Sequence, residues 1–146
     1  MTADRRTLPW RWALAALLLP ALLALAWQAW TIAGVRALAE DWRRAHAARD
    51  LAAMEALHRW EGVSPGSRAR IRLVLAQELE QPVADVRVVP LVADDLRLGP
   101  DSRLNGEPVG AVEIRCDADA RLVARLLVGR DGLGFRFLLA VPAAGP

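Results

Sequence analysis

The longest apolar run of the chain covers residues 12–35, WALAALLLPALLALAWQAWTIAGV, and contains no charged residue. A helix rises about 1.5 Å per residue, so this run reaches roughly 36 Å and exceeds the ~30 Å hydrocarbon core of a bilayer. Backbone polar groups inside lipid must be satisfied within the segment. The run therefore predicts a transmembrane helix, with a kink at Pro20 because proline removes one helical hydrogen bond.

Residues 1–11 are predicted to form a short cytoplasmic tail before this transmembrane helix. Arg5, Arg6 and Arg11 lie in the tail, although further arginines follow the span, so the count of basic residues alone is nearly balanced. Long domains that follow a span cross the membrane largely regardless of their charge. The favoured orientation is a single-pass protein of a bacterial inner membrane with its C-terminal domain in the periplasm.

Four tryptophans bracket the apolar run, with Trp10 and Trp12 before it and Trp27 and Trp30 near its end. Because indole rings collect at membrane–water interfaces, all four are predicted to be membrane-interface residues in contact with lipid. A cleaved signal peptide is the competing interpretation, with cleavage after Ala26. Cleavage there would leave an exposed hydrophobic end that starts at Trp27, so an uncleaved anchor is favoured.

Residues 36–61 contain no glycine or proline and are rich in alanine, leucine, glutamate and arginine. These residues are strong helix formers, so the segment predicts a periplasmic helical rod that continues the transmembrane helix. Apolar positions, including Leu38 and Trp42, follow a 3-4-3 spacing that later shifts toward Leu51. Leu38, Trp42 and Leu51 are therefore candidate protein-interaction residues, and the stripe packs either on its own domain or on another helix.

His46, Asp50, Met54 and His58 recur at intervals of four along the predicted rod. The spacing resembles a ladder of metal ligands. However, each step of four overshoots a helical turn by about 40°, so the two histidines diverge by about 120° around the helix. A surface contact between one histidine and Asp50 is favoured over a metal site.

Residues 62–146 are predicted to form one small α+β domain. Ser64, followed by Pro65, or alternatively Ser67 caps a helix at 68–80, whose apolar face is Ile71, Val74, Leu75 and Leu79. Strands are predicted at 83–92, 95–98, 109–116 and 133–141, and the first is expected to end, lie at an edge or bulge at Pro90. In the strand at 109–116, Val112, Ile114 and Cys116 are predicted to face the core, and Glu113 and Arg115 to face outward. A second helix is predicted at 118–128, capped by Asp117 or Asp119 and closed by Gly129 or Gly132. The order helix, strand, strand, helix, strand is the ferredoxin-like plan in its permuted α-β-β-α-β form.

Residues with catalytic potential are few and scattered along the chain. Both histidines lie on the predicted rod, and the glycines at 129, 132 and 134 follow a predicted helix, whereas a phosphate loop precedes one. Asp94-Asp95 is assigned to a turn, and Cys116, the only cysteine, is predicted to point into the core. The prediction is a protein that is not an enzyme, with no catalytic residue, cofactor, metal ion or small-molecule substrate.

Charge adds one further exclusion. All 19 basic residues are arginine and the net charge is only +2, without a dense basic patch interleaved with aromatic residues. Nucleic-acid binding therefore has no support.

The pattern of elements resembles a known group of membrane proteins. The segments that carry the resemblance are RALAEDWRRAHAARDLAAMEALHRW, IRLVLAQELEQPVADVRVVPL and VGAVEIRCDADARLVARLLVGRDGLGFRFLLAV. They resemble the general (type II) secretion protein M family, especially its subtype b, and its pilus counterpart PilO.

This resemblance implies a non-enzymatic scaffold or adaptor of a type II secretion or pilus-type assembly platform. Such a protein would form a homodimer or pair with related single-span platform proteins through rods and sheet edges. The last predicted strand is one candidate edge, which adds Phe135, Phe137 and Leu139 to the candidate interaction residues. The alternatives are an accessory subunit of a respiratory or photosynthetic membrane complex and a periplasmic ligand-sensing module.

Overall fold

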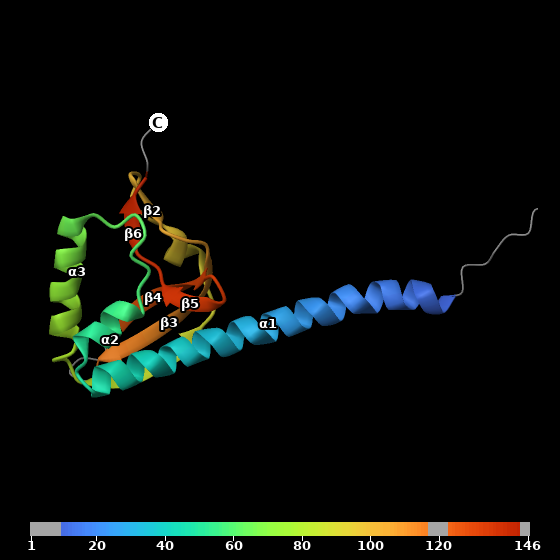
Figure 1. Cartoon of the computed structure of the whole chain (residues 1–146), viewed down its shortest axis with the longest axis horizontal. Coiled ribbons are helices and arrows are strands. Elements are labelled where there is room, and N and C mark those ends of the chain that lie inside the picture. Colours follow the sequence, from blue (N-terminus) through green and yellow to red (C-terminus); the bar gives the residue numbers. More distant parts are fainter. Residues whose placement is uncertain (1–9, 117–122, 144–146) are drawn as a thin grey trace, which may run out of the picture. The chain divides into compact units, whose positions relative to one another are not determined.

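A computed structural model of the chain describes residues 10–116 and 123–143 and shows an α+β protein (Figure 1). A long N-terminal apolar helix is followed by short helices and then by antiparallel strands. The chain divides into two compact units, Met1–Ile32 and Ala33–Pro146. The second unit contains the sheet and all the helices that cover it.

Helix α1, Trp10–Ala47, confirms the predicted N-terminal helix and continues through Pro20. From Leu18 onward it is long and apolar enough to cross a membrane, as a membrane span or a signal sequence would be. Large apolar side chains such as Leu18 and Ile32 are exposed in this part of the helix. Residues 1–9, most of the predicted cytoplasmic tail, lie outside the described part of the chain.

The prediction of one continuous helix through residue 61 is wrong, because α1 ends at Ala47. Arg49 takes a positive φ of 52° and reverses the chain. Asp50 then caps helix α2, Leu51–Ala56, where its Oδ1 accepts a hydrogen bond from the Ala53 amide at 3.0 Å. The break lets α2 bury Met54 completely in the domain core, so tertiary packing outweighs the strong helix propensity of the segment.

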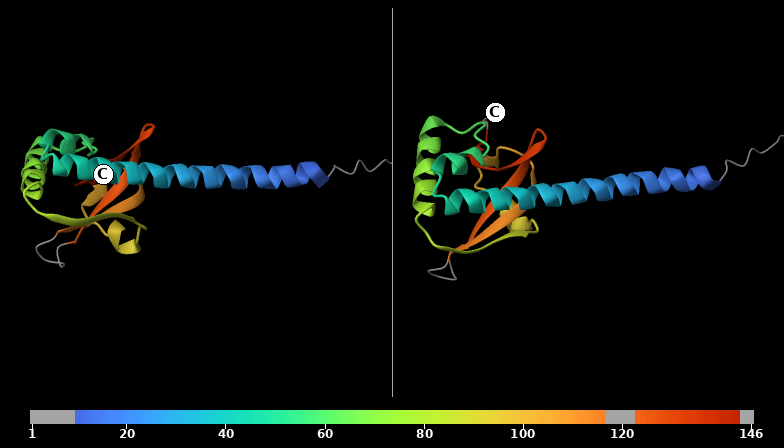
Figure 2. Two further views of the ribbon diagram at one scale, coloured as in Figure 1. Left: turned by 90° about the horizontal axis from the view of Figure 1, so that it is seen from below. Right: turned by 60° about the horizontal axis from the view of Figure 1, so that its bottom comes forward.

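The final turns of α1 supply the central helix of the domain. Their buried side chains are Val35, Leu38, Ala39, Trp42 and Ala45, all part of the main hydrophobic core. Between the two alternatives for the predicted stripe, packing on its own domain is therefore the one found. Figure 2 shows this part of α1 running along the sheet.

Helix α3, Pro65–Glu78, begins directly after the predicted Ser64 cap, which is earlier than the predicted range 68–80. Ser64 is its N-cap and accepts a hydrogen bond from the Ser67 amide at 3.2 Å, and proline occupies the first helical position. Leu75 and Leu79 pack into the core.

The 3-10 turn η1, Ala93–Leu96, occupies the place of the predicted strand at 95–98, so that prediction is wrong. The Asp95 carboxylate accepts a hydrogen bond from the Val92 amide at 2.9 Å, which favours a turn.

The main sheet is antiparallel, with four strands in the order β1-β3-β4-β5. Its strands are β1, Val83–Val89, β3, Pro108–Cys116, β4, Val123–Asp131, and β5, Gly134–Phe137. Strands β2, Ser102–Leu104, and β6, Ala140–Pro142, form a separate ribbon. Strand β1 lies at an edge, contains an irregularity and ends before Pro90, as the sequence predicts for a strand next to proline. The single strand predicted at 133–141 is instead divided between β5 and β6.

The predicted helix at 118–128 is wrong over its described part, which is the beginning of β4. This strand lies between β3 and β5 and is covered on both faces. Leu126 and Val128 contact the helix-covered core, while Leu127 belongs to a second cluster with Ala111 and Leu138. A strand buried on both faces has a continuous apolar run, which sequence periodicity cannot distinguish from a helix.

The element order therefore differs from the permuted α-β-β-α-β plan, because a strand follows β3 where that plan has its second helix. The predicted caps Asp117 and Asp119 lie outside the described residues. The predicted inward and outward positions of β3 are confirmed only in part, because Glu113, predicted to face outward, is 8% exposed. Val112 and Ile114 are buried in the core and Arg115 is exposed, while Cys116 is half-buried.

Candidate functional site

The predicted interfacial tryptophans are described only at one end of the apolar run. Trp27 and Trp30 are 56% and 37% exposed, and their ring centroids lie 5.5 Å apart. Helix α1 starts at Trp10, but the side chains of Trp10 and Trp12 are outside the described part. The aromatic belt at the membrane interface stays a prediction. Trp27 and Trp30 have the exposed side chains that contact with lipid requires.

The six candidate interaction residues fall into two groups. Leu38, Trp42 and Phe137 are buried in the core, so in this structure they hold the domain together and are closed to another chain. Leu51, Phe135 and Leu139 are half-buried, and of these Leu139 lines a surface groove.

The histidine ladder of the sequence is divided between two segments. His46 lies on α1, where its ring stacks on Trp42 at 4.9 Å and its Nε2 is 3.0 Å from the Glu78 carbonyl oxygen. His58 lies after α2 and its Nδ1 donates a hydrogen bond to the Met54 carbonyl at 2.8 Å. Burial lowers the pKa of His58 and favours its neutral form. No group of three His, Cys, Asp or Glu side chains could hold a metal ion within residues 10–116 and 123–143.

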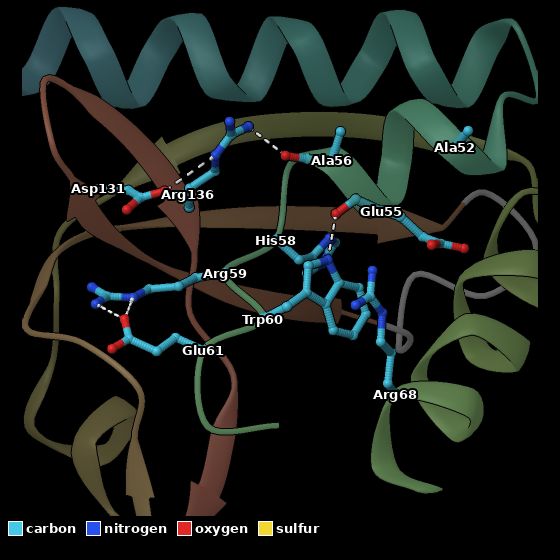
Figure 3. Close-up of a pocket in the computed structure, with 10 residues that line it drawn as sticks. All are labelled: Ala52, Glu55, Ala56, His58, Arg59, Trp60, Glu61, Arg68, Asp131 and Arg136. Atoms are coloured by element: carbon cyan, nitrogen blue, oxygen red, sulfur yellow. Dashed lines mark hydrogen bonds and ion pairs between the residues drawn. The ribbon is translucent and has the colours of Figure 1, made fainter. Parts of the chain in front are cut away.

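A polar pocket of about 490 Å³ opens beside α2 (Figure 3). It is lined by Ala52, Glu55, Ala56, His58, Arg59, Trp60, Glu61, Arg68, Asp131 and Arg136. The Arg68 guanidinium lies over the Trp60 ring at 4.7 Å from its centroid, a cation–π arrangement. Trp60 Nε1 donates a hydrogen bond to the Glu55 carbonyl at 2.8 Å, which fixes the ring beneath Arg68.

Charged side chains of the polar pocket already contact one another or the backbone. Arg59 pairs with Glu61, and Arg136 donates to the Ala56 carbonyl while its Nε lies 3.7 Å from Asp131. The lining contains three arginines and three acids, so their charges balance. The Arg136 hydrogen bond attaches the end of α2 to the β4–β5 hairpin. Because the charges of the lining balance, a strong net attraction for a charged ligand is not expected.

A second hollow is an apolar groove of about 560 Å³ between α3 and the sheet. It is lined by His58, Ile71, Val74, Leu75, Gln77, Glu78, Gln81, Cys116, Val123, Ala124, Leu126 and Leu139. Val74 on α3 is 60% exposed and Val123 on β4 is 43% exposed, while Leu75 is buried. Burial raises the pKa of Glu78 and thereby favours its neutral form. The groove thus leaves apolar side chains exposed at its surface.

The groove lining includes residues that the sequence predicted to be part of the core. The apolar face predicted for α3 includes Val74, but α3 presents Val74 to solvent and buries Leu75. Cys116, predicted to point into the core, lies half-buried in the lining. An apolar position on the inward stripe of a helix gives no sign of whether the domain itself covers it, so the groove was missed.

A network of charged side chains stabilises the opposite face of the sheet. Arg125 donates to both carboxylate oxygens of Asp95 at 2.8 Å and lies 3.3 Å from Glu113 Oε2. Arg87 donates to Glu113 Oε1 at 2.6 Å. Two-pronged arginine–carboxylate pairs are among the stronger polar contacts. The Arg125 hydrogen bonds lower the pKa of Asp95, and those from Arg87 lower the pKa of Glu113.

We expect replacement of Asp95 by asparagine to weaken the pH dependence of stability. The folded pKa of Asp95 lies below its ordinary value of 3.8, so its stabilisation is complete above that value and is lost as the pH falls through the folded pKa. Thermal melts of the full chain in detergent between about pH 3 and pH 7 should give D95N a lower melting temperature at neutral pH than the unmodified chain. The melting temperature of D95N should also fall less as the pH is lowered. Asp94→Asn is the control, because Asp94 is 80% exposed and bonds only weakly to Arg97 at 3.3 Å. Equal acid profiles for D95N and the unmodified chain would contradict the assignment.

Comparison with known proteins adds no further identification. No protein-family model, no curated protein and no solved structure matches this chain.

Proposed function

We propose that this protein is a non-enzymatic adaptor, anchored by its N-terminal helix, whose domain binds an apolar segment of another membrane-anchored protein. The observation that carries the proposal is the apolar groove, where Val74 and Val123 are exposed beside the buried Leu75. Exposed apolar surface of this kind is typical of interaction sites. A partner held in the same membrane meets the groove at a high effective concentration, so a modest contact area suffices.

The groove is better suited to a partner than the sheet edges are. At the β5 edge, the Phe137 amide donates to the Leu57 carbonyl and the Arg59 amide donates to the Phe137 carbonyl, both at 2.9 Å. At the β1 edge, Arg43 donates to the Val86 carbonyl. The chain itself thus satisfies part of each edge, an arrangement that discourages strand addition.

The more specific proposal is an inner-membrane component of a type II secretion or pilus-type assembly platform. Its N-terminus would lie in the cytoplasm and its domain in the periplasm, with related single-span proteins or a second copy as partners. The long apolar helix followed by an α+β domain supports this proposal, together with the resemblance of the sequence pattern. An accessory subunit of another membrane complex would need the same anchor.

A ligand-sensing module is a second candidate, favoured by the polar pocket and its Arg68–Trp60 pair. Small-molecule sites combine concavity with a few fixed polar groups, which this pocket has. The two functions predict different sensitive residues. Arg68→Ala should abolish ligand binding by a sensor and leave partner capture by the groove unchanged.

Adjacent substitutions on α3 test the adaptor proposal. Val74→Asp places a charge in the groove and should reduce copurification of the membrane-anchored partner from detergent-solubilised native membranes by about tenfold or more, because an unpaired charge would be buried. Leu73→Asp is the matched control, since Leu73 is 66% exposed and lies outside the groove lining. Retention of the partner by both variants would contradict the groove as the binding site.

A further inference from the structure

The tip of the β4–β5 hairpin carries an unusually exposed apolar side chain. Leu133 is 92% exposed, more than any other large hydrophobic residue in the described part of the chain. Asp131 pairs with Gly134, so Gly132 and Leu133 form a two-residue loop. Gly132 has a positive φ of 59°, which fits the first loop position of a type II′ turn. The second position accepts polar residues equally well, so the turn itself does not explain the leucine.

The neighbouring residue of the hairpin connects it to the end of the apolar run. A Cβ atom added at Gly34 of α1 would overlap the Phe135 ring, so this ring lies directly against the helix backbone. Val35, the last residue of the run, is 2% exposed, and a Cβ at Gly110 of β3 would lie 3.2 Å from its side chain. The sheet and its β4–β5 hairpin therefore pack on the residues where the apolar run ends.

We propose that the tip of the β4–β5 hairpin contacts the lipid bilayer and inserts Leu133 into its surface. The inference rests on the proposed function in one respect, since it requires that α1 anchors the chain in a membrane. Gly34 follows Ile32, the last residue of the first unit, by two positions, so a hairpin packed on Gly34 stays close to the end of the membrane anchor through the chain itself.

The composition of the loop suits a shallow insertion. Glycine at positions 132 and 134 leaves Leu133 as the only side chain between Asp131 and Phe135, whose ring packs on α1. The Asp131–Arg136 pair is 3.7 Å apart with side chains 49% and 41% exposed, so it can remain in the polar headgroup region. One leucine transferred from water gains about 1.5–3 kcal/mol of burial, enough to orient a tethered domain and too little to anchor a free one.

The experiment places a fluorescent probe at the tip of the full-length chain. Cys116 is the only cysteine, so a Cys116→Ala background allows single-site labelling of Leu133→Cys with the environment-sensitive dye NBD. The chain is reconstituted in phosphatidylcholine vesicles with or without doxyl-labelled lipid. Leu73→Cys is the control, because Leu73 is 66% exposed on α3. Trp27→Cys reports independently whether the apolar helix has inserted.

The proposal expects NBD at position 133 to emit at shorter wavelength than NBD at position 73 in the same vesicles, and to be quenched by doxyl lipid. The probe at position 73 should stay water-like and unquenched. Quenching at position 27 without quenching at position 133 would overturn the hairpin inference and leave the anchor intact. Absence of quenching at all three positions would overturn the anchor and the hairpin contact together.

Discussion

Replacement of Trp42 by alanine is expected to destabilise the domain by about 3–5 kcal/mol, a large part of the total stability of a small domain. Trp42 is 0% exposed and packs in the core that α1 shares with the sheet. Its removal leaves a cavity that surrounding side chains fill only partly. Denaturant unfolding of the full chain in detergent, followed by far-ultraviolet circular dichroism, measures the loss.

Two further substitutions make the Trp42 result specific. Trp30→Ala removes the same side chain from the exposed part of α1 and should leave unfolding of the domain unchanged. Trp42→Phe should lower the free energy of unfolding clearly less than the alanine variant does. It creates a smaller cavity, and it removes a buried Nε1 donor for which the described residues offer no hydrogen-bond partner. A W42A variant as stable as the unmodified chain would mean that this part of α1 is a separate rod.

Replacement of Gly34 by alanine should also destabilise the domain, by about 1–3 kcal/mol, although alanine favours helices by up to ~1 kcal/mol over glycine. The added Cβ would overlap the Phe135 ring, so either the ring or the β4–β5 hairpin must move away from α1. The same denaturant unfolding measures the change. A second readout is the Leu133 probe, whose lipid quenching should weaken if the hairpin moves.

Gly66 provides the matched control for this close approach. It lies in α3, and a Cβ atom added there meets nothing within 4 Å. Gly66→Ala should therefore keep or slightly raise the free energy of unfolding, because it reduces the freedom of the unfolded chain. If G34A proved as stable as G66A, the packing of Phe135 on the α1 backbone would be refuted.

Local sequence signals predicted those parts of the fold that depend on neighbouring residues. The charge-free run indicated the first part of α1, Ser64-Pro65 placed the start of α3, and alternation in β3 identified Val112 and Ile114 as inward-facing. Each of these signals acts within one turn or one strand. None of them requires knowledge of what the element packs against.

The incorrect predictions concern elements that tertiary contacts decide. Residues 48–50 have no glycine or proline, yet Asp50 caps a new helix because burying Met54 requires the chain to turn. Strand β4 has helix-forming residues, but β3 and β5 pair with it on both sides and Leu127 and Val128 are buried on opposite faces. The groove was missed for a related reason, since only the assembled domain leaves Val74 uncovered.

Photo-crosslinking in intact native membranes tests the central claim of an anchored adaptor most directly. A photoreactive amino acid at Val74 should yield one discrete adduct between the full-length chain and a membrane-anchored partner, and the same probe at Leu73 should yield none. Mass spectrometry of the adduct should show that the chain still contains the residues before Trp27. A soluble mature chain that begins at Trp27, or equal adducts from both positions, would contradict the account.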